Sequence, residues 1–195
     1  MAEPRLPPHR LILIAIVVAI LVAIGTQMHW EWVAQYRGEI VKGVLLTLLL
    51  LVSTSVAGFL LAIPLGLAQA RGPRPLAWLA RGFCNLIRGT PLLLQLWILY
   101  YGLGSLFPYI LGLRGSWLWP VLADPWIYAF CALTLSFAGY EGEIMRGAFA
   151  GVPRGELEAA RSLGMSPFSI LRRIWLPRAV QRVLPTLNGE LIIQL

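Results

Sequence analysis

The segment from residue 44 to residue 70 contains no charged residue and consists largely of leucine, valine and alanine. A helix of about 20 apolar residues crosses the hydrocarbon core of a bilayer. The whole chain is 58% hydrophobic and only 13% charged, whereas globular chains carry about 25% charged residues. These features exclude a soluble enzyme and a disordered tail, and they predict an all-α polytopic membrane protein.

Four more segments have the composition of membrane helices. Residues 11–28 follow a basic start, and we interpret them as a retained helix ahead of the core, although a cleaved signal peptide has a similar pattern. Two others cover residues 90–107 and 126–145, and a last one begins near Val183. The distance from there to Leu195 is about 20 Å of helix, against a bilayer core of about 30 Å. We therefore expect the chain to be truncated inside its penultimate helix.

Small residues spaced by four mark one face of the longest span. Gly58, Ala62 and Gly66 would let another helix approach closely. Pro64, in the same segment, predicts a kink. We expect this face to pack against a helix rather than to line a pore.

Two proline-containing pairs predict where spans begin. Thr90 precedes Pro91, and Asp124 precedes Pro125. In each pair a side-chain oxygen can cap the helix while proline occupies the first helical position. The third and fourth spans are therefore expected to start at these pairs.

The charges gather between the spans and indicate the orientation of the chain. Residues 71–88 hold four arginines and no acid, and residues 146–182 hold seven arginines and two acids. By the positive-inside rule both segments are cytoplasmic, as are residues 1–10, whereas residues 30–42 and 107–124 lie outside. The net charge of +7 is then loop charge, and the apolar runs between the arginines argue against a nucleic-acid-binding protein.

The chain lacks the residue clusters that catalysis requires. Its two histidines, His9 and His29, are far in sequence from any carboxylate pair or cysteine, so no metal site is predicted. Its only lysine, Lys42, follows no glycine-rich loop, and no serine stands in a G-x-S-x-G sequence. We expect no catalytic residue, metal or cofactor in this chain; if the protein uses ATP, another chain hydrolyses it.

Two short amphipathic helices are predicted between the fourth and fifth spans. The first covers residues 155–164 and ends at a glycine; the second starts at Ser166, an N-cap, with Pro167 in its first turn. Helices this short are not stable alone in water. Their apolar faces need a partner surface, either the membrane base of the same chain or a cytoplasmic protein. The apolar residues are Leu157, Ala160 and Leu163 in the first helix and Phe168, Leu171 and Ile174 in the second.

Three motifs carry a resemblance to a known family. The EAA signature of permease subunits in ATP-binding cassette (ABC) importers has all its fixed positions filled, by Glu158-Ala159-Ala160, Gly164, Ile174 and Leu176-Pro177. Two further motifs of polar amino acid permeases are similar to Arg88-Gly89-Thr90-Pro91 and Glu143-Ile144-Met145-Arg146-Gly147. The chain thus resembles the permease subunit of a polar amino acid importer over residues 43–195.

The resemblance implies a fold, a set of partners and a location. It implies about five core transmembrane helices, one extra helix at residues 11–28, and a cytoplasmic coupling loop at residues 146–182. The implied partners are ATPase subunits that carry ATP and Mg, a periplasmic solute-binding protein, and a second permease subunit, the same or different, in a bacterial inner membrane. The residues implied to couple to the ATPase are Gly155, Glu158, Ala159, Ala160, Gly164, Ile174, Leu176 and Pro177. Glu156 departs from the family, which often has glutamine there.

Asn188 and Glu190 stand in the last predicted span and mark a candidate solute path. A carboxylate inside a membrane helix is costly and usually faces a cavity or a partner. Two interpretations stay open for Glu190. It pairs with an arginine such as Arg88, Arg146 or Arg182, or it attracts a cationic solute, which would be a basic amino acid or an opine.

A second class of function competes with the importer. A self-contained channel or secondary carrier would need no ATPase. Proton- or sodium-coupled carriers normally place ionisable groups at mid-membrane depth, and few such groups stand in these spans. This scarcity argues against the carrier and leaves the ATPase-driven permease, which the resemblance implies, as the leading hypothesis.

Overall fold

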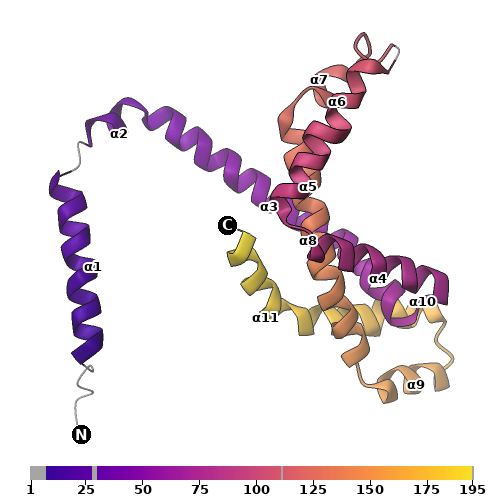
Figure 1. Cartoon of the computed structure of the whole chain (residues 1–195). Coiled ribbons are helices and arrows are strands. Elements are labelled where there is room, and N and C mark those ends of the chain that lie inside the picture. Colours follow the sequence, from indigo (N-terminus) through magenta and orange to yellow (C-terminus); the bar gives the residue numbers. More distant parts are fainter. Residues whose placement is uncertain (1–7, 28–29, 111, 195) are drawn as a thin grey trace, which may run out of the picture. The chain divides into compact units, whose positions relative to one another are not determined.

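Helices follow one another along the chain, joined by short connections (Figure 1). The computed structural model describes residues 8–27, 30–110 and 112–194, and those ranges contain no strand. For residues 8, 187, 188 and 190–194 it describes the backbone but not the side chain. The chain divides into two units, residues 1–46 and residues 47–195. The predicted all-α class is confirmed.

The first unit contains α1 (Pro8–Gln27), α2 (Glu31–Gln35) and the start of α3 (Arg37–Arg71). The described side chains of α1 are exposed along its whole length. An apolar helix whose side chains are exposed on all sides is suited to contact with lipid.

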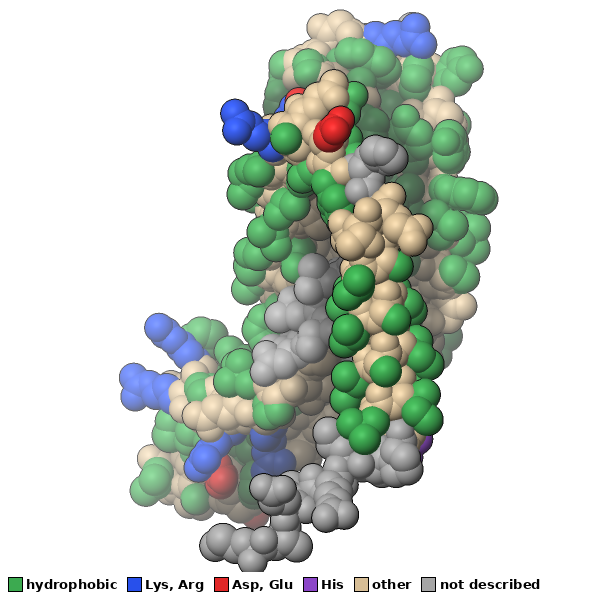
Figure 2. Space-filling view, turned by 90° about the vertical axis from the view of Figure 1, so that its left-hand side faces the viewer, with side chains coloured by type: hydrophobic (Ala, Val, Ile, Leu, Met, Phe, Trp, Pro, Cys, Tyr) green, Lys and Arg blue, Asp and Glu red, His purple; other side chains and the backbone are tan. Residues whose placement is uncertain are grey.

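In the space-filling view hydrophobic side chains dominate the visible surface, and most of the few charged ones are Lys or Arg (Figure 2).

Three described helical segments are long and apolar enough to cross a membrane: His9–Gln27, Arg37–Arg71 and Leu92–Tyr109. They coincide with the first three predicted spans. The fourth predicted span falls in α8 (Pro125–Gly151), whose 27 residues extend about 40 Å. The fifth begins within α11 (Leu176–Gln194).

In the second unit α8 is the central helix: α11 packs along it, and α3 contacts it through small residues. Gly58, Ala62 and Gly66 are all buried, as the small-residue pattern predicts. A methyl group added at Gly58 would lie 2.7 Å from Cβ of Phe137, and one at Gly66 would lie 2.5 Å from Cβ of Met145. The two helices therefore touch where these glycines leave room. Pro64 lies inside α3 without ending it.

The segment interpreted only as a cytoplasmic loop contains a helix, α4 (Arg74–Gly89), that packs along α8. Ala80 and Cys84 are buried on its inner side. Its apolar residues recur at helical spacing between the arginines. The sequence analysis missed this helix because it assigned the segment to a loop from its number of arginines.

Thr90 does not cap the third span as predicted. Its hydroxyl donates to the carbonyl oxygens of Leu86, at 3.0 Å, and Ile87, at 3.2 Å, so it caps the C-terminal end of α4.

The third span is a continuous helical segment of four parts. These are α5 (Leu92–Trp97), a π-helical turn η1 (Ile98–Leu103), α6 (Gly104–Leu106) and a 3-10 turn η2 (Phe107–Tyr109). After it comes α7 (Trp119–Leu122). The carboxylate of Asp124 accepts from the Trp126 amide at 2.9 Å and begins α8 as expected.

The segment predicted to be a coupling loop, residues 146–182, continues directly into α11. Helix α9 (Arg154–Ser162) is separate, but α10 (Pro167–Ile170), the π-helical turn η3 (Leu171–Trp175) and α11 follow without a break. The prediction of a second isolated short helix is therefore wrong. Pro177 lacks the amide that would bond to the carbonyl of Arg173, and the wider π turn lies where that bond is lost. The helix thus passes through the proline instead of stopping there.

Candidate functional site

The turn between α9 and α10 has a defined backbone geometry. Gly164 has φ of +74°, a conformation that side-chain-bearing residues rarely adopt. The amide of Gly164 donates to the carbonyl of Arg161 at 2.9 Å, and the amide of Met165 donates to that of Ala160 at 3.2 Å. This pair of bonds is a Schellman motif. The predicted glycine stop is confirmed.

The inner face of this loop packs on its own chain. Leu157, Ala160 and Ile170 are buried in one cluster with Phe149 of α8 and Ala179 of α11. Ser166 caps α10 as predicted, accepting from the Ser169 amide at 3.3 Å. Of the two predicted partner surfaces, the membrane base of the chain therefore covers the inner face.

The outer face of the loop is left uncovered by the described chain. Leu163 is 82% exposed and Phe168 is 70% exposed. Leu163 does not share the buried face of Leu157 as predicted, because it follows the last turn of α9, where the chain leaves the helical path. Leu163, Gly164 and Phe168 form what we call the loop tip. These two exposed apolar side chains make the loop tip a candidate contact surface.

The residues that resemble the EAA signature divide between the two faces. Glu158, Ala159 and Gly164 are exposed, as are Gly155 and Pro177, whereas Ala160 is buried. Ile174 and Leu176 are half-buried against the core cluster. The signature thus combines positions that anchor the loop with positions that present its surface.

Trp175 joins three helices at the base of the loop. Its indole N–H donates to the carbonyl of Phe149 at 2.9 Å, and the two rings meet edge to face at 5.2 Å. The guanidinium of Arg71, at the end of α3, lies 5.3 Å from the indole ring centre. The sequence analysis did not select Trp175, which occupies the variable position of the signature. The signal that could have identified Trp175 in the sequence is a large aromatic residue close to several arginines.

Replacing Trp175 by phenylalanine is expected to lower the stability of the folded permease by about 0.5–1.5 kcal/mol, the net contribution of one hydrogen bond. The aromatic contact with Phe149 would largely persist, so the Phe149 carbonyl loses the indole donor and keeps only the longer bond from the Val152 amide, at 3.4 Å. Thermal unfolding of the purified protein measures the change. Trp78→Phe is the matched control because Trp78 is 75% exposed. An equal loss of thermal stability in both variants would contradict a stabilising hydrogen bond from Trp175.

Glu156, the residue that departs from the family, forms an ion pair with Arg178. The carboxylate oxygen lies 3.1 Å from Nε of Arg178, and both side chains are partly exposed. Exposed pairs of this kind contribute about 0–1 kcal/mol. The pair links α9 to α11.

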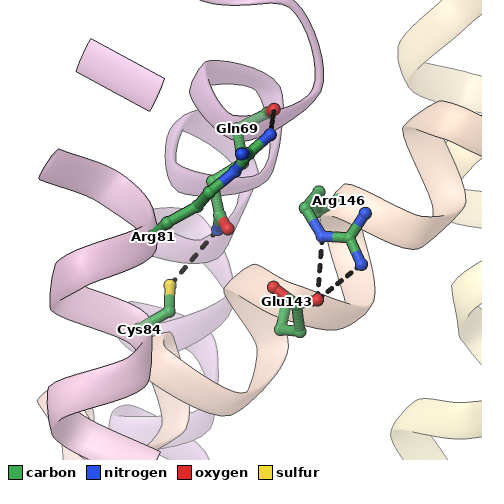
Figure 3. Close-up of polar contacts among 5 residues, drawn as sticks. All are labelled: Gln69, Arg81, Cys84, Glu143 and Arg146. Atoms are coloured by element: carbon green, nitrogen blue, oxygen red, sulfur yellow. Dashed lines mark hydrogen bonds and ion pairs between the residues drawn. The ribbon is translucent and has the colours of Figure 1, made fainter. Parts of the chain in front are cut away.

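The other two motifs lie on α4, α5 and α8. In the third motif, Arg146 donates from Nε to the Glu143 carboxylate at 2.8 Å (Figure 3). In the second, Arg88 lies 5.8 Å from the ring centre of Tyr140, while Gly89 and Gly147 are exposed. The Gln95 amide donates to the carbonyls of Ile87, at 2.8 Å, and Thr90, at 3.0 Å. Gln95, which the sequence analysis missed, therefore fixes the corner at Pro91.

Near the third motif, α3 and α4 are joined by polar contacts. The side-chain amide of Gln69 donates to the sulfur of Cys84 at 3.3 Å, and Arg81 donates to the main-chain carbonyl of Gln69 at 3.4 Å (Figure 3). Burial raises the pKa of the Cys84 thiol, and the bond from Gln69 partly opposes that effect. Cys84 is thus a buried, weakly reactive thiol. It serves packing rather than chemistry.

Glu141 is a buried acid that the sequence analysis did not single out. It is fully buried in α8, one turn from both Phe137 and Met145, which contact Gly58 and Gly66 of α3. An acid at such a position is costly in a membrane protein. By contrast, Asn188 and Glu190 belong to α11 by their backbone, but their side chains lie outside the described residues.

The described residues contain no group of three His, Cys, Asp or Glu side chains that could hold a metal ion. What the geometry offers is an anchored loop with an uncovered apolar tip.

Comparison with known proteins places this geometry in a family. Residues 62–193 match the family described as "Binding-protein-dependent transport system inner membrane component". The chain belongs to this family. The family predicted from the three motifs is therefore confirmed.

Relatives within this family include permeases named for several solutes. The octopine transport system permease protein OccM of Rhizobium meliloti is 42% identical over 79% of this chain and 61% of its own length. The nopaline permease NocM of Agrobacterium fabrum is 38% identical, over 75% and 60%. The arginine permease ArtM of Escherichia coli K12 is 34% identical, over 82% and 70%. The chain spans about three fifths of the length of the octopine and nopaline relatives.

Two solved structures share the fold of this family member. An amino acid ABC transporter crystallised with histidines gives a TM-score of 0.64 at 28% identity, over 85% of this chain and 72% of that chain. The MetNI methionine ABC transporter gives a TM-score of 0.63 at 21% identity, over 82% and 71%. The second likeness is one of fold alone.

Proposed function

We propose that this chain is the permease subunit of an ABC importer that moves a polar amino acid into the cytoplasm. In this proposal ATP and Mg are bound by partner ATPase subunits, a periplasmic binding protein delivers the solute, and a second permease subunit completes the path. The chain lies in a bacterial inner membrane with its N-terminus in the cytoplasm. Relatives named as octopine, nopaline and arginine permeases support the importer class.

The observation that carries the proposal is the exposed loop tip on an anchored loop. The tip presents Leu163 and Phe168, while Leu157 and Ile170 hold the same loop to α8 and α11. A partner that binds the loop tip and moves would therefore also move the loop and the helices against which it packs. Rigid-body movement of packed elements is a common form of such transmission, and alternating access in transporters uses movements of this kind.

The loop tip is testable by co-purification of the ATPase subunit. In the full-length transporter, Leu163→Ser with Phe168→Ser is expected to weaken ATPase association at least about a hundredfold, since each buried apolar side chain contributes about 1.5–3 kcal/mol. The matched control is Trp78→Ser with Leu86→Ser, which alters two exposed apolar residues of α4. Retention of the ATPase by the tip variant, or its equal loss from the control, would contradict the proposed docking site.

The solute proposed for this importer is a basic amino acid or an opine. Arginine carries a guanidinium group, and octopine and nopaline are derivatives of arginine, so these three relatives are named for solutes that share this cationic group. Glu190 is the acid proposed to attract such a solute in the path, with Asn188 beside it. The permease TcyB of Bacillus subtilis, 34% identical, is named for a different solute, L-cystine.

Glu190→Gln is expected to reduce uptake of arginine by about tenfold or more and to leave uptake of neutral amino acids nearly unchanged. Competition by unlabelled amino acids against labelled solute measures the difference. Glu39→Gln, which changes an exposed acid in the first turn of α3, is the control. Equal losses for cationic and neutral solutes, or failure of the subunits to assemble, would assign Glu190 to structure.

A further inference from the structure

A groove of about 650 Å³ lies between the end of α3, the start of α4 and the coupling loop. Most of its lining is apolar and includes Leu67, Leu157 and Trp175. Arg71 and Arg161 also line it, and none of its lining residues is acidic. Neither arginine takes part in the two ion pairs found among the described residues. The groove is therefore apolar with a net positive charge.

A second cavity, of about 520 Å³, lies along α3 and α4 and shares part of its lining with this groove. Pro64, Ala68 and Leu76 line both cavities. The lining of the second cavity contains no charged or polar side chain; it includes Leu61, Leu79 and Phe83. The two cavities are therefore neighbours, one wholly apolar and one with a basic end, and we call the pair the track.

The basic end is arranged to receive an anion. Arg71 lies against the face of Trp175, which limits the positions of its guanidinium. Guanidinium groups bind phosphate through paired hydrogen bonds. An apolar channel next to such a group suits an acyl chain, and basic pockets on the cytoplasmic side of membrane proteins bind anionic head groups. A neutral helix from a neighbouring subunit would leave both arginines without a counter-charge.

We propose that this track holds one anionic phospholipid, with its phosphate at Arg71 and Arg161 and an acyl chain along Leu76, Leu79 and Phe83. The lipid would then connect α3 and α4 to the coupling loop, because Arg161 belongs to α9 and Arg71 to α3. This inference is independent of the proposed transport function. It concerns what the membrane itself supplies to the fold.

Native mass spectrometry of the full transporter tests the site, with phosphatidylglycerol and phosphatidylcholine as probes. The parent should retain phosphatidylglycerol in preference to phosphatidylcholine. Arg71→Gln with Arg161→Gln should retain it about thirtyfold more weakly. Arg172→Gln with Arg173→Gln, which removes the same charge from exposed side chains outside the groove, should behave like the parent. Equal loss from both double variants, or equal retention of the two lipids, would overturn the proposal.

A second pair of variants tests the apolar part of the track without removing an arginine. Leu76→Glu places a carboxylate in the lining of both cavities, on a residue that is 49% exposed and can be replaced without disturbing the core. It should abolish retention of phosphatidylglycerol, whereas Leu86→Glu, on the same helix but outside both cavities, should not. Excess glycerol phosphate should fail to displace the lipid. Displacement by it, or full retention by Leu76→Glu, would show that the groove binds free phosphate or nothing.

Discussion

Gly164→Asp is expected to abolish solute uptake by the assembled transporter while the permease itself still folds. Within the chain, a side chain at this position would meet no atom within 4 Å, so its folding cost comes from the φ of +74° alone. That cost is about 1–2 kcal/mol for a residue with a side chain. The carboxylate, however, would stand in the loop tip beside Leu163 and Phe168. An uncompensated charge in a closed apolar interface costs about 3–5 kcal/mol, which weakens association at least about a hundredfold.

Gly164→Asn is the matched control for this substitution. Asparagine has nearly the same shape and also tolerates the left-handed conformation, but it carries no charge. Uptake into proteoliposomes that contain the full transporter should fall to background with aspartate and stay within a few-fold of the parent with asparagine. Parental uptake with aspartate, or a loss with asparagine as large as with aspartate, would show that the charge meets no partner there.

Gly66→Leu is expected to prevent the permease from folding to a stable, monodisperse protein. A Cβ at this position would lie 2.5 Å from Cβ of Met145 and 2.9 Å from the backbone nitrogen of Arg146. Backbone atoms of α8 cannot move aside as a flexible side chain can. Overpacking typically costs about 1–3 kcal/mol, and a leucine at a backbone contact exceeds that range because the two helices must separate.

Gly82→Leu is the control for the α3–α8 contact. Gly82 also lies in a helix, but a side chain there would meet nothing within 4 Å. Size-exclusion profiles and thermal unfolding of both variants measure the outcome. The control should be unchanged or slightly more stable, because leucine favours helix more than glycine does. A Gly66→Leu variant that unfolds at the parental temperature would contradict close packing of α3 on α8.

Local rules predicted the ends of helices where one side chain decides them. Gly164, Ser166 and Asp124 each act within a few residues of their own position, so the sequence is enough to identify them. The small-residue face of α3 was also predictable, because Gly58 and Gly66 have a spacing that only close helix contact uses.

Features that depend on contacts between distant segments were not predictable. The helical spacing of apolar residues in α4 was readable, but its packing against α8, where Ala80 and Cys84 are buried, was not. The helix through Pro177 depends on the π turn before it. Trp175 becomes important only when Phe149, 26 residues earlier, lies beside it. Such pairings are set by packing, which no window of sequence contains.

Uptake of labelled arginine into proteoliposomes separates the ATPase-driven importer from a self-contained channel or secondary carrier. Vesicles with the full transporter should accumulate arginine only when ATP is enclosed on the cytoplasmic side and the binding protein is present outside. Vesicles with the permease subunit alone should take up none above background. Uptake by the permease alone, at the same rate with and without ATP, would contradict a function that depends on the coupling loop and its ATPase partner.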